Sequence, residues 1–140
     1  MASENDGVME LEEVFFGVSA FLQRKLVKIC MMHDVVDAIS AYFAYYCAQN
    51  DLNRMASALR VMINISYTTE GSNALAAAGL PVMICENIVN GNWECKTIMR
   101  ALDVLLHFAL SPGQQLLDAA ENGVIDMLSA FLHELNLLSS

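Results

Sequence analysis

Cysteine and histidine are the side chains of this 140-residue sequence that could hold a metal ion or serve as nucleophile and base. The cysteines form no CxxC pair, and each lies in an apolar stretch. We therefore expect reduced, buried thiols rather than disulfides or a zinc site. The four are Cys30, Cys47, Cys85 and Cys95.

The three histidines, His33, His107 and His133, fall in different parts of the chain. No HExxH, GxSxG, P-loop or Rossmann glycine motif accompanies them. A pairing of Cys95 with His107 stays open, because sequence alone does not give their proximity in space. We predict no catalytic residue, no metal and no cofactor, and a protein that binds a partner rather than an enzyme.

Length and charge narrow the choice of partner. The chain is long enough for one domain with a continuous core. Its formal net charge is −9, and its seven basic residues all lie between Arg24 and Arg100, which argues against a nucleic-acid partner. An acidic start and the lack of an apolar run of membrane-spanning length indicate neither a signal peptide nor a membrane span, so we expect a cytoplasmic or nuclear protein.

The elements that carry these residues are predicted to be helices, because apolar residues recur at i, i+3, i+4 and i+7. One such stripe recurs 43 residues later in the sequence, which indicates an internal repeat. The stripes are Met55, Ala58, Leu59, Met62 and Ile65, and then Ile98, Ala101, Leu102, Leu105 and Phe108.

Glycine residues are expected to separate helices of the repeat. The period of the repeat is 44 or 45 residues when the flanking segments are aligned. Gly79 and Gly123 stand where a short helix must stop, in a position that favours the left-handed conformation. Asp34 replaces glycine in an earlier copy, and we expect that junction to be built differently. Asn50 and Asp51 separate two further helices and supply the next N-cap.

These features resemble the armadillo repeat, in which a short helix, a second helix and a longer third helix form one unit. The segment from Ala58 to Ser66 resembles that family's third-helix signature, and Asn64 takes the place of its asparagine. HEAT repeats share much of the pattern. The resemblance implies an all-α, right-handed α-solenoid with about two full units and partial capping units.

The domain boundaries follow from this register. We predict a disordered acidic lead over residues 1–8 and a single helical repeat domain over 9–140. Within it, a cap and partial unit cover 9–34, full units cover 35–79 and 80–123, and a partial unit covers 124–140. A helix that carries Phe15, Phe16 and Phe21 is expected to cap the stack, and Trp93 is expected to cover the core at a helix start.

The resemblance also implies a site, because third helices of this family line a concave groove for an extended peptide. Its asparagine position falls on Asn64 and His107, its tryptophan position on Arg60 and Asp103, and the position one turn earlier on Ser57 and Arg100. Only Asn64 matches the family residue, which argues against importin-like capture of basic peptides. Arg60 and Asp103 could instead pair across neighbouring repeats.

Two other functions remain open from the sequence. The stack could self-associate through apolar residues of its last helix, namely Leu128, Phe131, Leu132 and Leu135. Alternatively, the chain could form a helical bundle that binds an amphipathic partner helix in a groove, although an internal repeat is not typical of such bundles. We predict a protein or peptide partner on the third-helix face.

Overall fold

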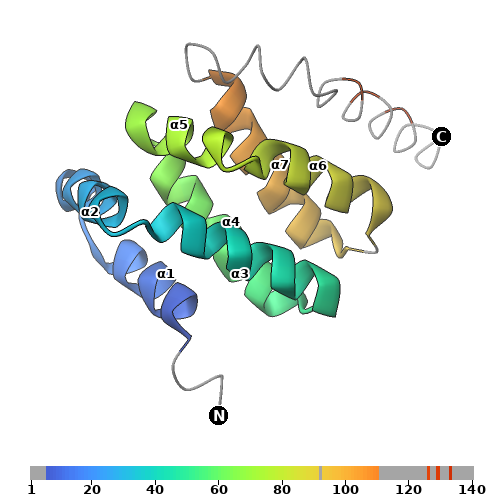
Figure 1. Ribbon diagram of the computed structural model, residues 1–140, viewed down its shortest axis with the longest axis horizontal. Helices are drawn as coiled ribbons and strands as arrows, with labels where there is room; N and C mark the ends of the chain where they lie inside the picture. The colour runs from blue at the N-terminus through green and yellow to red at the C-terminus, as the bar shows by residue number, and fades with distance from the viewer. Residues whose placement is uncertain (1–5, 92, 111–125, 127–128, 130–132, 134–140) are drawn as a thin grey trace.

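The computed structural model describes residues 6–91 and 93–110, together with the isolated positions 126, 129 and 133. Within this part of the chain every regular element is a helix, so the predicted all-α fold is confirmed (Figure 1). The self-association residues predicted beyond 127 and the junction at Gly123 lie outside the described residues. The helices are α1 (Gly7–Gly17), α2 (Ala20–Met32), α3 (Val35–Gln49), α4 (Leu52–Ser66), α5 (Thr69–Ala77), α6 (Leu80–Asn90) and α7 (Cys95–Leu110).

Helix α4 forms the centre of the molecule, because α1, α2, α3, α5 and α7 all pack against it. Five consecutive residues, from Met55 to Leu59, are buried. Successive residues of a helix point about 100° apart, so such a run means that this half of α4 is enclosed on every side. Later in the helix Met62 and Ile65 are fully buried as well.

The predicted repeat register implies that α7 buries the same positions as α4. Met62 and its counterpart Leu105 are both buried, as are Ala58 and Ala101. Leu102, however, is only partly buried, whereas its counterpart is fully buried. Among the described helices, α4 has α1 on one side and α7 on the other, but α7 packs closely only on α4, α5 and α6. In the described part of the chain, therefore, no helix covers one flank of α7, whereas the same flank of α4 is covered.

The junctions between helices use the left-handed backbone conformation. Gly79 has φ +78°, as predicted for a glycine that stops a short helix. Asp34, expected to build its junction differently, adopts the same conformation with φ +53°. A short polar side chain tolerates this region better than a branched one, so aspartate can stand in for glycine here. Asn50 is also left-handed, and Asp51 then caps α4 by accepting from the Arg54 N–H, as expected.

The N-terminal segment differs from the sequence prediction in two respects. The expected single helix with three phenylalanines is broken after Gly17, and Ser19 caps a separate helix α2. Phe15 is buried, but Phe16 is 94% exposed and Phe21 is 68% exposed. The predicted disordered lead over residues 1–8 is also too long, because Asp6 is buried and caps α1.

Trp93 is buried, in keeping with its expected place over the core, and its ring meets the edge of Phe43 at 6.2 Å between centroids. Among the described residues no single helix is long and apolar enough to cross a membrane. Helices α5 and α6 reach the length and composition only as a pair, across a bend of 64°.

The unequal burial of Leu59 and Leu102 yields the first prediction. Leu59→Ala should lower the free energy of unfolding by about 2–5 kcal/mol, because it leaves a cavity in an enclosed site. Leu102→Ala should cost only about 1–2 kcal/mol, because part of that side chain is already in water. Urea denaturation of both variants measures the difference. A loss at Leu102 as large as that at Leu59 would show that the flank of α7 is covered after all.

Candidate partner-binding surface

Beyond Met55, helix α4 leaves only a short stripe of three residues at the surface. Arg60, Ile63 and Asn64 are each half-buried, and their i, i+3, i+4 spacing puts them on one side of the helix. Arg60 forms an ion pair with Glu12 of α1, with 2.6 Å between Nη1 and Oε1. The sequence-based pairing of Arg60 with Asp103 is therefore wrong, because α1 lies nearer to this guanidinium.

Asn64 uses both ends of its side-chain amide within the chain. Its Nδ2 donates to the Arg60 carbonyl at 2.8 Å, and its Oδ1 accepts from Nε2 of Gln23 at 2.8 Å. The second bond joins α4 to α2. An asparagine that holds a peptide backbone needs both groups available, so Asn64 would have to release Gln23 before it could act in that way.

A hollow of about 350 Å³ lies beside this stripe, between α1 and α4. Phe16 stands at its edge with 94% of its surface exposed. Glu13 is also exposed, and it forms no ion pair with any described residue. The lining residues are Glu12, Glu13, Phe16, Arg60, Ile63 and Asn64. The hollow thus combines apolar surface with one carboxylate that has no cationic partner among the described residues.

The three predicted residues on α7 form a second group. Nδ1 of His107 lies 2.8 Å from the Asp103 carbonyl oxygen, to which it donates when it carries the proton, and the same nitrogen lies 3.7 Å from the Asp103 carboxylate. Arg100 and Asp103 line another hollow, of about 450 Å³, with Met99 and Leu102. This hollow lies on the flank of α7 that no described helix covers.

Tyr67 links the two groups. Its ring meets His107 edge-on with 4.7 Å between centroids, and it lines a further hollow of about 270 Å³ that also includes Asn64 and Gln23. Ser57 belongs to neither group, because it is only 2% exposed. The sequence prediction of Ser57 as a surface contact is therefore corrected: this flank of α4 is enclosed. Tyr67 and Phe16 were absent from the predicted site.

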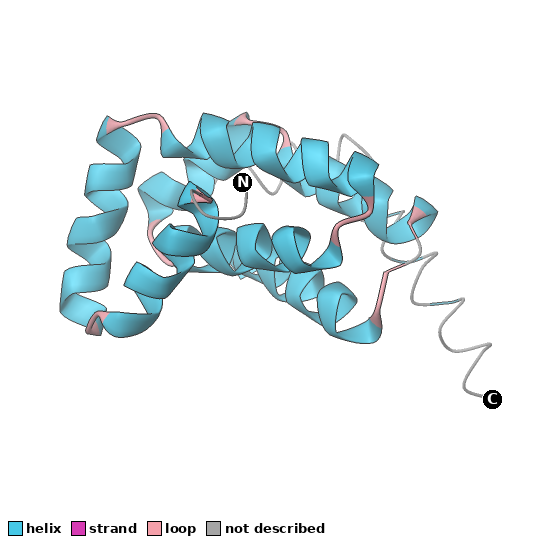
Figure 2. Cartoon of the chain, turned by 90° about the horizontal axis from the view of Figure 1, so that it is seen from below, coloured by secondary structure: helices cyan, strands magenta, loops and turns pink. Residues whose placement is uncertain are grey.

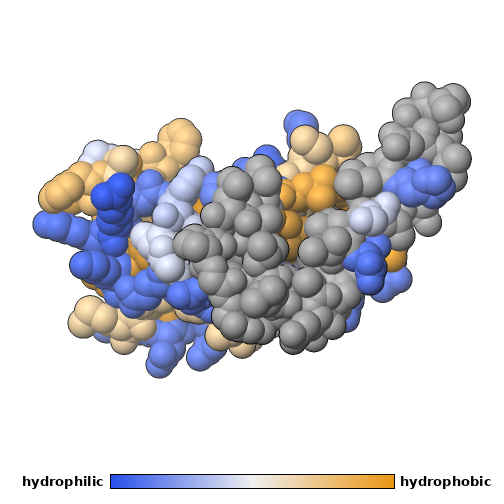
Figure 3. Space-filling model, turned by 90° about the horizontal axis from the view of Figure 1, so that it is seen from above, coloured by the Kyte–Doolittle hydropathy of each residue, from blue (hydrophilic) through white to orange (hydrophobic). Residues whose placement is uncertain are grey.

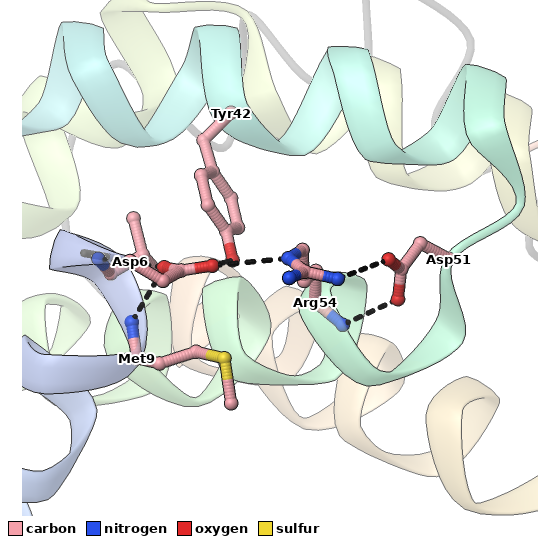
Figure 4. Close-up of polar contacts among 6 residues, drawn as sticks. Asp6, Met9, Tyr42, Asp51 and Arg54 are labelled. Carbon is pink, nitrogen blue, oxygen red and sulfur yellow. Dashed lines mark hydrogen bonds and ion pairs between the residues drawn. The ribbon is translucent and has the colours of Figure 1, made fainter. Parts of the chain in front are cut away.

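A partly buried polar cluster around Asp6 positions α1 against the rest of the molecule (Figure 4). The Asp6 carboxylate accepts a hydrogen bond from the Tyr42 hydroxyl at 2.6 Å and pairs with Nε of Arg54 at 3.2 Å. Its other oxygen caps α1 by accepting from the N–H groups of Val8 and Met9. Arg54 in turn pairs with Asp51 at 2.7 Å. The cluster therefore ties α1 to α3 and α4, and α1 supplies one wall of the hollow.

The environment shifts the pKa values of this cluster in opposite directions. Burial raises the pKa of the Asp6 carboxyl, but bonds from Tyr42, the Met9 N–H and Arg54 outweigh it, so that the pKa falls below its usual value. Burial, and then the adjacent Asp6, raise the pKa of Tyr42 well above its usual range. The ionised aspartate and the neutral tyrosine are thus the stable pair.

An aspartate directly before a helix is recognisable in the sequence as an N-cap. The partners of Asp6, however, are Tyr42 and Arg54, which lie 36 and 48 residues away and leave no local signal in the sequence.

The residues considered for chemistry are dispersed. Cys95 and His107 lie in one helix twelve residues apart, which is about 18 Å along its axis and too far for a catalytic pair. Cys95 is exposed and Cys47 is half-buried, so the expectation of buried thiols is correct only for Cys30 and Cys85. Burial raises the pKa of Cys47 to about 12 and that of Cys85 to about 11, so both thiols stay protonated near neutral pH. In the described part of the chain no three potential metal ligands come together.

No family model, curated protein or solved structure gives a significant match to this chain. Its function must therefore be inferred from its own geometry and repeat pattern.

The Asp6 cluster predicts how stability depends on pH. Because the folded-state pKa lies below the unfolded value of about 4, ionised Asp6 stabilises the fold above that pH, and the contribution is lost as pH falls through the folded-state pKa. Asp6→Asn should lower the free energy of unfolding at pH 7 by about 1–3 kcal/mol, and the gap to the unaltered chain should narrow below about pH 4.

Urea denaturation between about pH 7 and pH 2.5 measures this gap. Asp37→Asn is the matched control, because Asp37 is an exposed aspartate in the first turn of α3. A gap for Asp6→Asn that stays constant with pH would contradict the proposed role of its charge.

Proposed function

We propose that this chain is a short armadillo-like α-solenoid that binds a peptide or protein partner, without catalysis, at the hollow between α1 and α4. The observation that carries the proposal is Phe16, which is 94% exposed at the edge of a hollow of about 350 Å³. The 43-residue offset between α4 and α7 and the left-handed junctions support the armadillo-like part.

The exposure of Phe16 supports binding because aromatic side chains contribute strongly to interfaces when they are buried. A large apolar side chain in water loses the hydrophobic stabilisation that a partner would restore, at about 25 cal/mol per Å² of buried apolar area. Ile63 offers further apolar surface in the same hollow. A partner residue with an apolar side chain would therefore pack between Phe16 and Ile63.

The walls of the hollow support binding in a second way, because they are held in place before any partner arrives. The Asp6 cluster and the Arg60–Glu12 pair both fix α1 on α4. A preformed site avoids the entropic cost of ordering its own side chains on binding. We therefore propose a recognition site that changes little between the free and bound states.

The proposed contact differs from the peptide-holding mode of the armadillo family. Asn64 already bonds to Gln23 and to the Arg60 carbonyl, so an apolar anchor at Phe16 would provide most of the affinity rather than an asparagine ladder. Arg100, Asp103 and His107 would extend the surface across Tyr67.

A peptide-display selection against the immobilised chain tests this function. Selected peptides should bind the unaltered chain, and Phe16→Ser should weaken their binding roughly tenfold or more, as expected for loss of a buried aromatic contact. Because Phe16 is almost fully exposed, this change should leave the free energy of unfolding of the free chain unchanged within about 0.5 kcal/mol. Titration calorimetry provides the affinities.

Val89→Ser is the matched control, because Val89 is an exposed apolar residue of α6 away from the hollow. It should leave peptide affinity unchanged. Selected peptides that bind Phe16→Ser as tightly as the unaltered chain, or a selection that enriches none, would refute the proposed site.

A further inference from the structure

Helix α2 forms one end of the molecule, at the left in Figures 1 and 2. Its inner side packs on α3 and α4 through buried Val27 and Cys30. No described helix covers its outer side. Two of the most exposed large apolar side chains of the described residues lie on that side, namely Met32, which is 78% exposed, and Phe21, which is 68% exposed.

The outer side of α2 is a continuous stripe. Phe21, Lys25, Lys28 and Met32 follow one another at spacings of three or four residues, and all four are exposed. Ile29 borders the stripe and is 52% exposed. The Lys25 ammonium lies 4.8 Å from the centroid of the Phe21 ring. The stripe therefore places two positive charges between apolar side chains, and Figure 3 shows hydrophobic and hydrophilic side chains mixed at this end.

Helix α1, near the same end, carries the opposite charge. It contains acidic residues and no basic one, whereas α2 contains basic residues and no acidic one. Its outer side presents Glu10, Glu13 and the half-exposed Val14, at spacings of one to four residues. Neither these carboxylates nor Lys25 and Lys28 form an ion pair with a residue in the described ranges.

We propose that this end of the molecule docks a second copy of the chain, with α2 of each copy against the outer side of α1 of the other. A two-fold axis makes the contact twice, because each copy contributes both a basic and an acidic stripe. Lysines then meet glutamates, and Phe21, Ile29 and Met32 are covered. The alternative pairing of α2 with α2 would place lysines opposite lysines, which is unfavourable.

Charge complementarity favours a second copy over other occupants. An anionic membrane laid on this end would meet Glu10 and Glu13 together with the lysines, and the chain as a whole has a net charge of −9. A second copy matches both stripes at once. This contact shares Glu13 with the proposed peptide site, whereas Phe16, Ile63 and Asn64 line the hollow and take no part in the contact.

Sedimentation equilibrium with charge-swapped variants tests the proposal. The unaltered chain should have twice its monomer mass of 15.4 kDa at about 100 μM, where a micromolar dimer is largely formed. Lys25→Glu with Lys28→Glu, and separately Glu10→Lys with Glu13→Lys, should each weaken dimerisation roughly tenfold or more, because each places like charges in contact. An equimolar mixture of the two variants should dimerise again, because both contacts in the mixed dimer join opposite charges.

Circular dichroism of each variant checks that it remains folded, which is expected because the four altered residues are exposed. A monomeric unaltered chain would overturn the proposal, even if that monomer bound vesicles containing phosphatidylserine through its lysines. Dimers that form equally in all variants, or separate variants whose mixture stays monomeric, would also overturn it.

Discussion

The enclosure of α4 is the constraint on which the rest of the structure depends. Residues 55–59 are buried in an unbroken run, and this is possible only because helices pack on every side of that segment. Ala56 and Ala58 are small enough to let neighbours approach closely. As a result, the surface that α4 offers beyond Met55 is confined to Arg60, Ile63 and Asn64, and the candidate site is confined with it.

Helix α1 completes that site, and two polar contacts of unequal strength hold it. The Arg60–Glu12 pair is partly exposed to water, so it contributes about 0–1 kcal/mol. The Asp6 side chain is only 4% exposed and gains bonds from Tyr42, Arg54 and two backbone N–H groups. In such a buried network each bond is stronger, because water competes less. Of these two polar contacts, the one at Asp6, at the start of the helix, therefore contributes more to the position of the hollow's wall, beside the apolar packing of Phe15.

Apolar spacing predicted the helices α4 and α7, the inward side of α4, and the buried Ala101 and Leu105 of α7, because these are local properties of the sequence. It could not predict that Ser57 is buried, since that depends on the packing of neighbouring helices around a small polar residue that would be tolerated on either side. The partner of Arg60 was misassigned for the same reason: two neighbouring helices carry acids, and only the packing decides between them. Phe16 was assigned to a helix that caps the stack, yet α1 buries Phe15, and Phe16, about 100° further around the helix, lies in water.

The dependence of the fold on α4 can be measured most directly by amide hydrogen exchange of the free chain. If α4 is the centre, its amides around Ala58, Val61 and Met62 should exchange only through global unfolding, and their protection should match the free energy of unfolding from urea denaturation. Amides of α2, whose outer side is uncovered in the single chain, should exchange faster through local opening. Equal or weaker protection in α4 than in α2 would contradict the account, because another element would then hold the fold together.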